Sequence, residues 1–298
     1  MLDSTPASAS PDRISAPVRR ATGRPVRGLP LAAWGRTPAA IIGFILTSVI
    51  IVVAVLADLI APGDPFATVG PALAAPSGAF PFGTDDLGRN LLTGVVHGVR
   101  TSVLVALAVG VVALPLGLLV GAVSGASRGR IDDLLMRFTE VWQILPRFFL
   151  ALMVIALFGP GLDRLVVVLG LTSWALLSRI VRAEILSIRE REFVEAAHAL
   201  GVPQWRIVGR HMLPHALPAA LVYVTLVLGQ VCLIEASLGF LGLSDPNVVS
   251  LGSLAGQAQR FLRVAWWMWF FPGIALITLV VGLNLIGDAL DDRIRGRH

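Results

Sequence analysis

The segment Glu195-Ala196-Ala197-His198-Ala199-Leu200-Gly201, which continues to Leu213-Pro214, is the longest polar interruption between hydrophobic runs in the second half of this chain. Apolar residues in and just before it recur at i, i+3, i+4 and i+7, a spacing that places them on one face of a helix. These residues are Phe193, Ala196, Ala197 and Leu200. Gly201 can adopt a positive φ angle, so we expect it to end this helix.

A second short helix is expected to follow the first. Pro203 suits its first turn, where the missing N–H costs nothing. Its apolar positions and its arginines fall on different faces: Trp205, Val208 and Met212 on one, Arg206 and Arg210 on the other. Two short helices between hydrophobic runs predict a docking surface for another protein.

The composition indicates a membrane protein. Of the 298 residues, 55% are hydrophobic and only 14% are charged, against about 25% charged residues in soluble proteins. The mean hydropathy is +0.79. All 24 basic residues are arginine, and a nucleotide-binding P-loop requires a lysine, so another chain must hydrolyse any ATP that drives this protein. The single cysteine, Cys232, excludes an intrachain disulfide.

The hydrophobic runs predict an all-α protein with six membrane-spanning helices. Residues 1–38 are rich in Ser, Pro, Ala and Arg and are expected to form a disordered basic arm. The first span is expected at 39–60, long enough to cross about 30 Å of hydrocarbon, and an extracytoplasmic loop at 61–97. Pro115 and Pro146 should kink the second and third spans. The remaining runs cover about 101–123, 141–158, 165–181, 215–238 and 264–287.

Small residues repeat every fourth position in the second run. Gly117, Gly121 and Gly125 share one helix face. Such a face lets another helix approach closely, and we expect helix packing there.

The arginines are distributed unevenly between the two sides of these spans. Eighteen lie on one side: six in residues 1–38, three in 128–137, six in 179–210 and three in 293–297. Five lie on the other side, and Arg147 falls inside a run: the five are Arg89, Arg100, Arg164, Arg260 and Arg263. Cytoplasmic segments carry the excess of positive charge, so both termini and the segment 190–214 are expected in the cytoplasm. This distribution accounts for the basic pI near 11.0 without a nucleic-acid partner.

Glu195-Ala196-Ala197, followed after three residues by Gly201 and after eleven more by Leu213-Pro214, resembles the cytoplasmic signature of ABC importer permeases. The pair Arg210-His211 is similar to the peptide branch of that family, whereas other branches have an aliphatic residue in place of the histidine. In the family this hairpin sits in a groove of the ATPase subunit.

Other segments resemble the C-type permeases of the peptide/nickel branch, and together they cover residues 38–295. The match before the second span is Gly83-Thr84-Asp85 with Gly88-Arg89-Asn90, where the branch usually has Asp at the last position. Leu238–Leu243 and Asn284–Asp292 are similar to later segments, with Asp291 at a position that is usually Arg. Val249-Ser250-Leu251-Gly252 replaces the usual Pro-Ser-Trp-Gly, which leaves the outer gate undefined.

The resemblance implies a type I ABC importer permease fold in a bacterial cytoplasmic membrane. It implies a five-helix core at 98–290 that includes the hairpin at 190–214, a peripheral first span, and a cytoplasmic tail at 291–298. The implied partners are a second, homologous permease chain in a heterodimer, two ATPase chains and an extracytoplasmic solute-binding protein. The chain itself would be a transport subunit with no catalytic residue and no cofactor. The residues implied to couple to the ATPase are Glu195, Ala196, Ala197, Leu200, Gly201, Arg206, Arg210 and Pro214.

The substrate and one residue leave alternatives open. Di- and oligopeptides are the expected cargo, but the branch also transports nickel chelates and other small solutes. A secondary transporter is the less favoured alternative, because it would show inverted repeats and ionisable groups in broken midplane helices, and apart from Glu235 the sequence shows neither. Glu235 is the one acid deep in a long hydrophobic run; it belongs either to a translocation path or to an interfacial or arginine-paired site. His211 and His215 have metal-ligand spacing, yet Pro214 lies between them and no carboxylate completes a set, so no metal site is expected.

Overall fold

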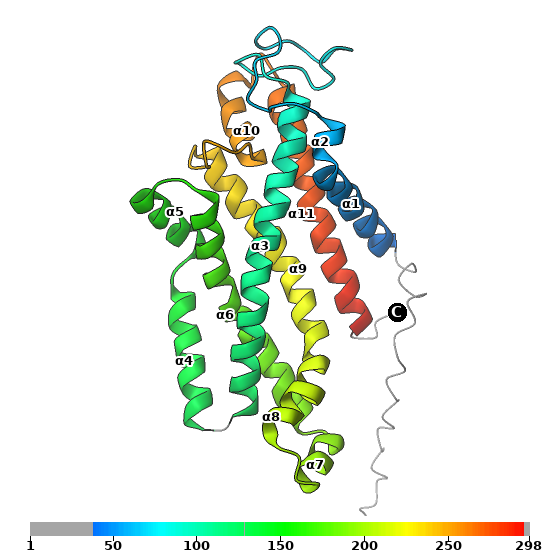
Figure 1. The fold of residues 1–298 in the computed structure, drawn as a ribbon, viewed down its shortest axis with the longest axis vertical. Coiled ribbons are helices and arrows are strands. Elements are labelled where there is room, and N and C mark those ends of the chain that lie inside the picture. Colours follow the sequence, from blue (N-terminus) through cyan, green and yellow to red (C-terminus); the bar gives the residue numbers. More distant parts are fainter. Residues whose placement is uncertain (1–37, 128, 295–298) are drawn as a thin grey trace, which may run out of the picture. The chain divides into compact units, whose positions relative to one another are not determined.

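The structure is a computed structural model that describes residues 38–127 and 129–294 (Figure 1). The described residues form helices, short turns and two isolated bridges, Thr68 with Arg89 and Thr84 with Asn90. The helices in chain order are α1 (Pro38–Val55), α2 (Ala57–Ile60), α3 (Leu91–Ala126), α4 (Arg130–Ile144), α5 (Arg147–Phe158), α6 (Leu162–Arg189), α7 (Glu192–Ala199), α8 (Gln204–Ile207), the π-helical turn η2 (Val208–Met212), α9 (Leu213–Phe240), α10 (Leu251–Ala258), the 3₁₀ turn η3 (Gln259–Phe261) and α11 (Trp267–Ile294).

Five helices in the described part of the chain are long and apolar enough to cross a membrane: α1, α3, α6, α9 with the turns before it, and α11. The α4 and α5 helices are bent by 69° at their junction and add a sixth crossing when the pair is one span. Pro146 stands at this junction, where its missing N–H interrupts the helical hydrogen bonds. The third hydrophobic run is therefore two helices, a sharper break than the predicted kink.

The second crossing begins earlier than its hydropathy indicates. α3 starts at Leu91, so the predicted loop at 61–97 ends at Asn90 and the predicted core begins before residue 98. The Asn90 Oδ1 accepts a hydrogen bond of 3.0 Å from the Leu92 N–H, which satisfies one of the free donors of the first turn. The His97 Nε2 lies 3.3 Å from the Ala61 carbonyl oxygen. Capping and local hydrogen bonds thus allow α3 to include polar residues. The helix therefore starts earlier in the chain than the hydropathy alone predicts.

Other helix boundaries also differ from those predicted. The first span, predicted at 39–60, consists of α1 and the short α2, which are separated at Leu56. α11 reaches Ile294, so helix continues into the predicted tail at 291–298. Charged residues lower the hydropathy there, but they are compatible with a helix that has left the apolar region. The predicted basic arm up to residue 37 and the tail from residue 295 lie outside the described residues.

The second helix of the predicted hairpin is not separate. α8 continues through η2 into α9, and the helix from Gln204 to Phe240 runs for 37 residues. Pro214 stands in the first turn of α9, with Pro218 one turn later. Neither proline can donate to the preceding turn, and the wider π-helical turn lies directly before them. The prediction of two short helices is therefore wrong for the second one.

Buried apolar side chains form clusters along the bundle. One lies near α10 and the start of α11 and includes Leu251, Met268 and Cys232. A second joins α3, α5, α6 and α9 around Val109 and Leu169. A third lies where α6 meets the 190–214 segment. The third cluster positions the functional site described below.

α3 and α6 pack closely because glycines line their contact. A Cβ atom on Gly117 would lie 2.6 Å from the Leu177 side chain, and one on Gly121 would lie 2.5 Å from the Ser178 carbonyl oxygen. A Cβ on Gly125 would lie 2.8 Å from the Ile185 side chain. No real Cβ fits at such distances, so the backbones meet only because these side chains are absent. The predicted glycine face is confirmed.

The Gly121→Ala variant should be less stable than the wild type by about 1–3 kcal/mol, because its new methyl group meets a backbone carbonyl that cannot rotate away. Gly273→Ala is the matched control. It lies inside α11, and no described residue comes within 4 Å of an added Cβ, so alanine there should be neutral or stabilise by up to about 1 kcal/mol. Free energies of unfolding from denaturant titration in mixed micelles provide the comparison. Equal stability of the two variants would contradict the proposed contact.

Candidate functional site

The hairpin, residues 190–214, connects α6 to α9 at the end of the bundle opposite α10 (Figure 1). Its first helix, α7, ends in a tight turn with Gly201 at φ +75°. The Gly201 N–H donates to the His198 carbonyl at 2.9 Å and the Val202 N–H to the Ala197 carbonyl at 3.1 Å. This pair of bonds is the Schellman arrangement that requires a residue of positive φ. The prediction that Gly201 ends the helix is confirmed.

Three buried side chains attach the hairpin to the bundle. Val194 of α7, Ile207 of α8 and Met212 of η2 are fully buried. They pack with Ile185 and Ile188 at the end of α6. Burial of side chains this large stabilises the attachment by about 1.5–3 kcal/mol each. The hairpin is therefore held firmly although its helices are short.

The predicted apolar face of α7 is only partly covered by the bundle. Phe193, Ala196 and Leu200 are exposed, Ala197 is half-buried against the core, and Val194 makes the fully buried contact. The Phe193 ring also stacks on His215 of α9, with the ring centroids 5.6 Å apart. The reason is geometric: Val194 lies about 100° round the helix from Phe193, and α6 meets α7 on the Val194 side. Ala196 and Leu200, with the exposed part of Phe193, are thus available to another molecule.

The tip of the hairpin exposes large apolar side chains. Leu200 is 82% exposed and Trp205 is 69% exposed. The guanidinium of Arg206 lies 5.1 Å from the Trp205 ring centroid. Glu195, Arg206, Arg210 and Pro214 are also exposed. Exposed apolar groups rimmed by charged residues mark surfaces that bind other proteins.

The hairpin and the last residue of α6, Arg189, contact the end of α3 through hydrogen bonds. Arg189 Nη1 donates to the carbonyl oxygens of Gly125 at 3.3 Å and Ser127 at 3.5 Å. Gln204 Nε2 donates to the Ala126 carbonyl at 3.4 Å. The last carbonyls of a helix have no partner within it, so these donors complete the C-terminal end of α3. These bonds tie the hairpin and the end of α6 to the end of α3.

A half-buried ion pair beside these bonds joins α4 to α6. Arg182 Nε and Nη2 each lie 2.6 Å from an oxygen of the Asp132 carboxylate. Ser124 of α3 donates to the same carboxylate. Two parallel N–H···O bonds make this geometry strong and specific. Sequence reasoning counted Arg182 only as a cytoplasmic charge and did not single out Asp132; an acid in the first turn of the helix after a basic loop was the available signal.

Glu235 lies within the bundle. Its side chain is 2% exposed, and its Oε2 accepts a hydrogen bond of 3.0 Å from Ser102 of α3. Ser250, the residue before α10, lies close enough to this carboxyl group to interact with it. In this conformation Glu235 joins α3, α9 and the α10 segment. A role in a translocation path would require these elements to separate.

Sequence comparison relates the chain to known transport proteins. The family described as "Binding-protein-dependent transport system inner membrane component" matches residues 113–297. A putative peptide transport system permease protein of Brucella suis is 38% identical over 253 residues, which are 84% of this chain and 85% of that protein. A dipeptide transport system permease protein of Alkalihalophilus pseudofirmus is 34% identical over 256 residues, covering 85% of this chain and 84% of that protein.

Structural comparison gives the same fold. The methionine ABC transporter MetNI in an inward-facing conformation superposes with a TM-score of 0.56 at 23% sequence identity, covering 68% of this chain and 95% of that chain. A second crystal form of the same transporter gives a TM-score of 0.56 at 22% identity. The fold is therefore the type I ABC importer permease fold, as predicted. The chain belongs to the family of inner membrane components of binding-protein-dependent transport systems, the permease subunits of ABC importers.

Proposed function

We propose that this chain is one of two related permease subunits of an importer of di- and oligopeptides. The observation that carries the proposal is its similarity over most of its length to permeases named for peptide and dipeptide transport. The energy would come from ATP hydrolysed by partner chains, because the sequence contains no lysine and hence no P-loop. An external solute-binding protein would deliver the peptide.

In this proposal the hairpin docks into a groove of an ATPase chain. Leu200 and Trp205 at the tip would provide the apolar anchors, and burial of each side chain contributes about 1.5–3 kcal/mol. Glu195, Arg206 and Arg210 surround them and would fix the register by charge complementarity. Ala196 and Ala197 are small enough to let the ATPase surface approach α7. Gly201 shapes the turn between the two arms of the hairpin, and Pro214 stands at the end of the second arm.

The hairpin would transmit the ATP-driven movement in two directions. Its second arm is continuous with α9, and Arg189 and Gln204 contact the end of α3. The Asp132–Arg182 pair extends the connection to α4. ATP binding would thus bias the switch between inward- and outward-facing states of the spans.

The proposed assembly has two permease chains in the bacterial inner membrane. Two ATPase chains bind on the cytoplasmic side, and one solute-binding protein binds on the extracytoplasmic side. The excess of arginine on the hairpin side supports a cytoplasmic hairpin and cytoplasmic termini. The helices from α3 to α11 would form the permease core, with α1 at its periphery.

Peptide uptake by the reconstituted complex tests the function. We expect the chain, combined in proteoliposomes with its permease partner, the ATPase chains and the binding protein, to import dipeptides in an ATP-dependent manner. The chain alone should neither hydrolyse ATP nor transport. In the same assay Gly201→Val should lower uptake by roughly tenfold, because a β-branched residue at positive φ costs about 1–3 kcal/mol.

Gly209→Ala is the control for this variant, since Gly209 is on the hairpin without positive φ and no described residue lies within 4 Å of its added Cβ. Full uptake by Gly201→Val would show that the hairpin shape is not needed for coupling. Import of a nickel chelate in place of any peptide would overturn the substrate assignment.

Association with the ATPase tests the docking surface directly. Leu200→Asp should weaken binding of the ATPase chains by at least about tenfold, because a charged carboxylate replaces an apolar anchor. The exposed side chain makes no contact that folding requires, so the amount of inserted protein should not change. Leu262→Asp, at another exposed leucine outside the hairpin, is the control. Co-purification of normal amounts of ATPase with Leu200→Asp would refute this role.

The Asp132–Arg182 pair should stabilise the hairpin end of the bundle. The side chains are only 14% and 31% exposed, so a double-mutant cycle with Asp132→Asn and Arg182→Gln should give a coupling energy of about 1–3 kcal/mol. The Glu140–Arg179 pair is the control, since its atoms lie 4.0 Å apart and its side chains are 59% and 48% exposed. That exposed pair should give about 0.5 kcal/mol or less. Similar coupling for both pairs in denaturant titrations would contradict the assignment.

A further inference from the structure

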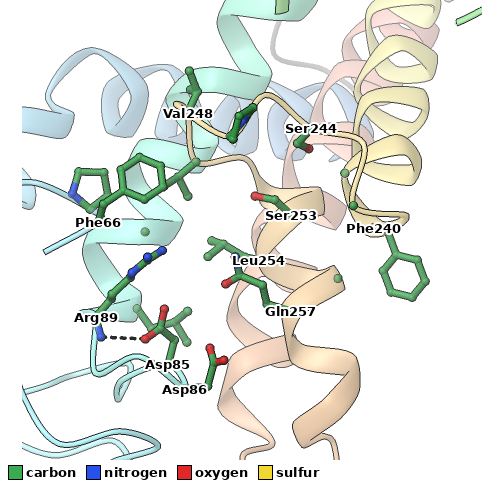
Figure 2. A pocket seen from close by; sticks show the side chains of 18 of the residues that line it. Phe66, Asp85, Asp86, Arg89, Phe240, Ser244, Val248, Ser253, Leu254 and Gln257 are labelled. Atoms are coloured by element: carbon green, nitrogen blue, oxygen red, sulfur yellow. Dashed lines mark hydrogen bonds between the residues drawn. The ribbon is translucent and has the colours of Figure 1, made fainter. Parts of the chain in front are cut away.

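A cavity of about 520 Å³ lies at the end of the bundle away from the hairpin (Figure 2). One wall is the segment before and at the start of α3, and the other is formed by the end of α9, the loop after it and α10. Small-molecule sites typically occupy about 300–1,000 Å³. The cavity therefore has the size of a small-molecule binding site. It lies away from the hairpin, and the coupling role proposed for the hairpin does not use it.

Two arginines line this cavity, the exposed Arg260 and the half-buried Arg89. The Arg89 backbone N–H is held by the Asp85 carboxylate at 2.8 Å, and its guanidinium carbon lies 5.2 Å from the Phe66 ring centroid. Figure 2 shows the side chain directed into the cavity. Its Nε is buried without a hydrogen-bond partner, and within the described part of the chain the guanidinium forms no ion pair. A guanidinium in this state fits a carboxylate, which accepts two parallel hydrogen bonds.

Asp85 bonds to backbone N–H groups and forms no ion pair with the Arg89 guanidinium within the described part of the chain. Burial raises the pKa of the Asp85 carboxyl above its usual value, although hydrogen bonds from the backbone of Arg89 and Leu87 and the positive charge of Arg89 oppose the shift. One Asp85 oxygen already accepts both of these N–H groups. The carboxyl of Asp85 thus orders the turn before α3, and the positive charge of Arg89 stays available to a ligand.

The cavity also offers an anion and an apolar wall. Asp86 lines it, and no hydrogen bond or ion pair within residues 38–127 and 129–294 engages its carboxylate. Asp245, in contrast, accepts hydrogen bonds from Asn247. Leu254 and Val248 are among the apolar residues of the lining (Figure 2). A cation and an anion that do not pair with each other therefore share one amphiphilic cavity.

We propose that this cavity binds a short peptide in its zwitterionic form, with the peptide carboxylate on Arg89 and the terminal ammonium on Asp86. Peptide side chains would lie against Leu254 and Val248. The alternative occupant is an acidic side chain of a docked binding protein. It would pair with Arg89 but leave Asp86 without a partner, whereas a zwitterionic peptide pairs with both charges. The inference rests on the proposed peptide importer and adds a substrate site to it outside the spans.

Ligand-observed NMR on the nanodisc-embedded permease–ATPase complex, without binding protein, tests the site. The probes are alanyl-alanine, its C-terminal amide and its N-acetyl derivative. Alanyl-alanine should bind saturably, and each blocked form should bind about tenfold more weakly, since each loses one charge-assisted contact. Arg89→Gln should no longer distinguish alanyl-alanine from the amide, and Asp86→Asn should no longer distinguish it from the acetylated form. Arg263→Gln and Asp58→Asn, which change exposed charges outside the cavity, should behave as the wild type.

Several results would overturn this site. They are the absence of a saturable signal, equal binding of blocked and free peptides by the wild type, and unchanged discrimination in both cavity variants. So would normal peptide binding by Arg89→Gln together with weaker binding of the external binding protein, since the cavity would then be a docking surface. Each of these leaves the proposed function standing if the complete system still imports dipeptides. Loss of the function itself would appear as absent uptake in the full reconstitution.

Discussion

The close approach of α3 to α6 is the contact on which the rest of the structure depends. It exists because Gly117, Gly121 and Gly125 leave no Cβ atom between the two backbones. With the helices this close, the end of α6 lies within hydrogen-bonding reach of the last carbonyls of α3. At the same end, Ser124 of α3 and Arg182 of α6 both bond to the Asp132 carboxylate of α4. A wider separation of α3 and α6 would break these contacts, because a donor and an acceptor more than about 3.5 Å apart no longer form a hydrogen bond.

Part of this arrangement follows from the sequence alone. The helical membrane fold, the glycine face and the turn at Gly201 were predictable, because hydropathy, residue size and backbone freedom are local properties. The predicted six spans are matched when the bent α4–α5 pair counts as one crossing; the described residues otherwise contain five. The face of α7 that meets the bundle was not, since Val194 is inward only because of where α6 ends. The continuity of α8 with α9 was also missed, because Pro203 and Pro214 both suggest separate helices in a linear reading. The pairing of Asp132 with Arg182 joins residues 50 positions apart, and no local pattern indicates it.

The two ends of the bundle differ in what they expose. At the hairpin, apolar side chains remain exposed, while buried neighbours and capped carbonyls hold the backbone in place. These properties suit a rigid element that binds another protein. At the opposite end, a turn ordered by Asp85 and Thr84 holds charged groups apart around an open space. The Thr84 carbonyl also accepts from the indole of Trp267 at 3.1 Å, which ties this turn to α11. Rigidity at one end and accessible charge at the other are consistent with a subunit that has a different partner on each side of the membrane.

The continuous helix from Gln204 to Phe240 can carry a movement from one end of the bundle to the other. Its 37 residues correspond to a rod about 55 Å long, and tilting such a rod by about 5° shifts one end by about 5 Å relative to the other. Phe240 at its far end forms part of the cavity wall that faces Arg89. A small rotation imposed at the hairpin would therefore alter the width of that cavity without any rearrangement in between. The amplification comes from length alone, so a movement applied at the hairpin needs only a modest amplitude at its source.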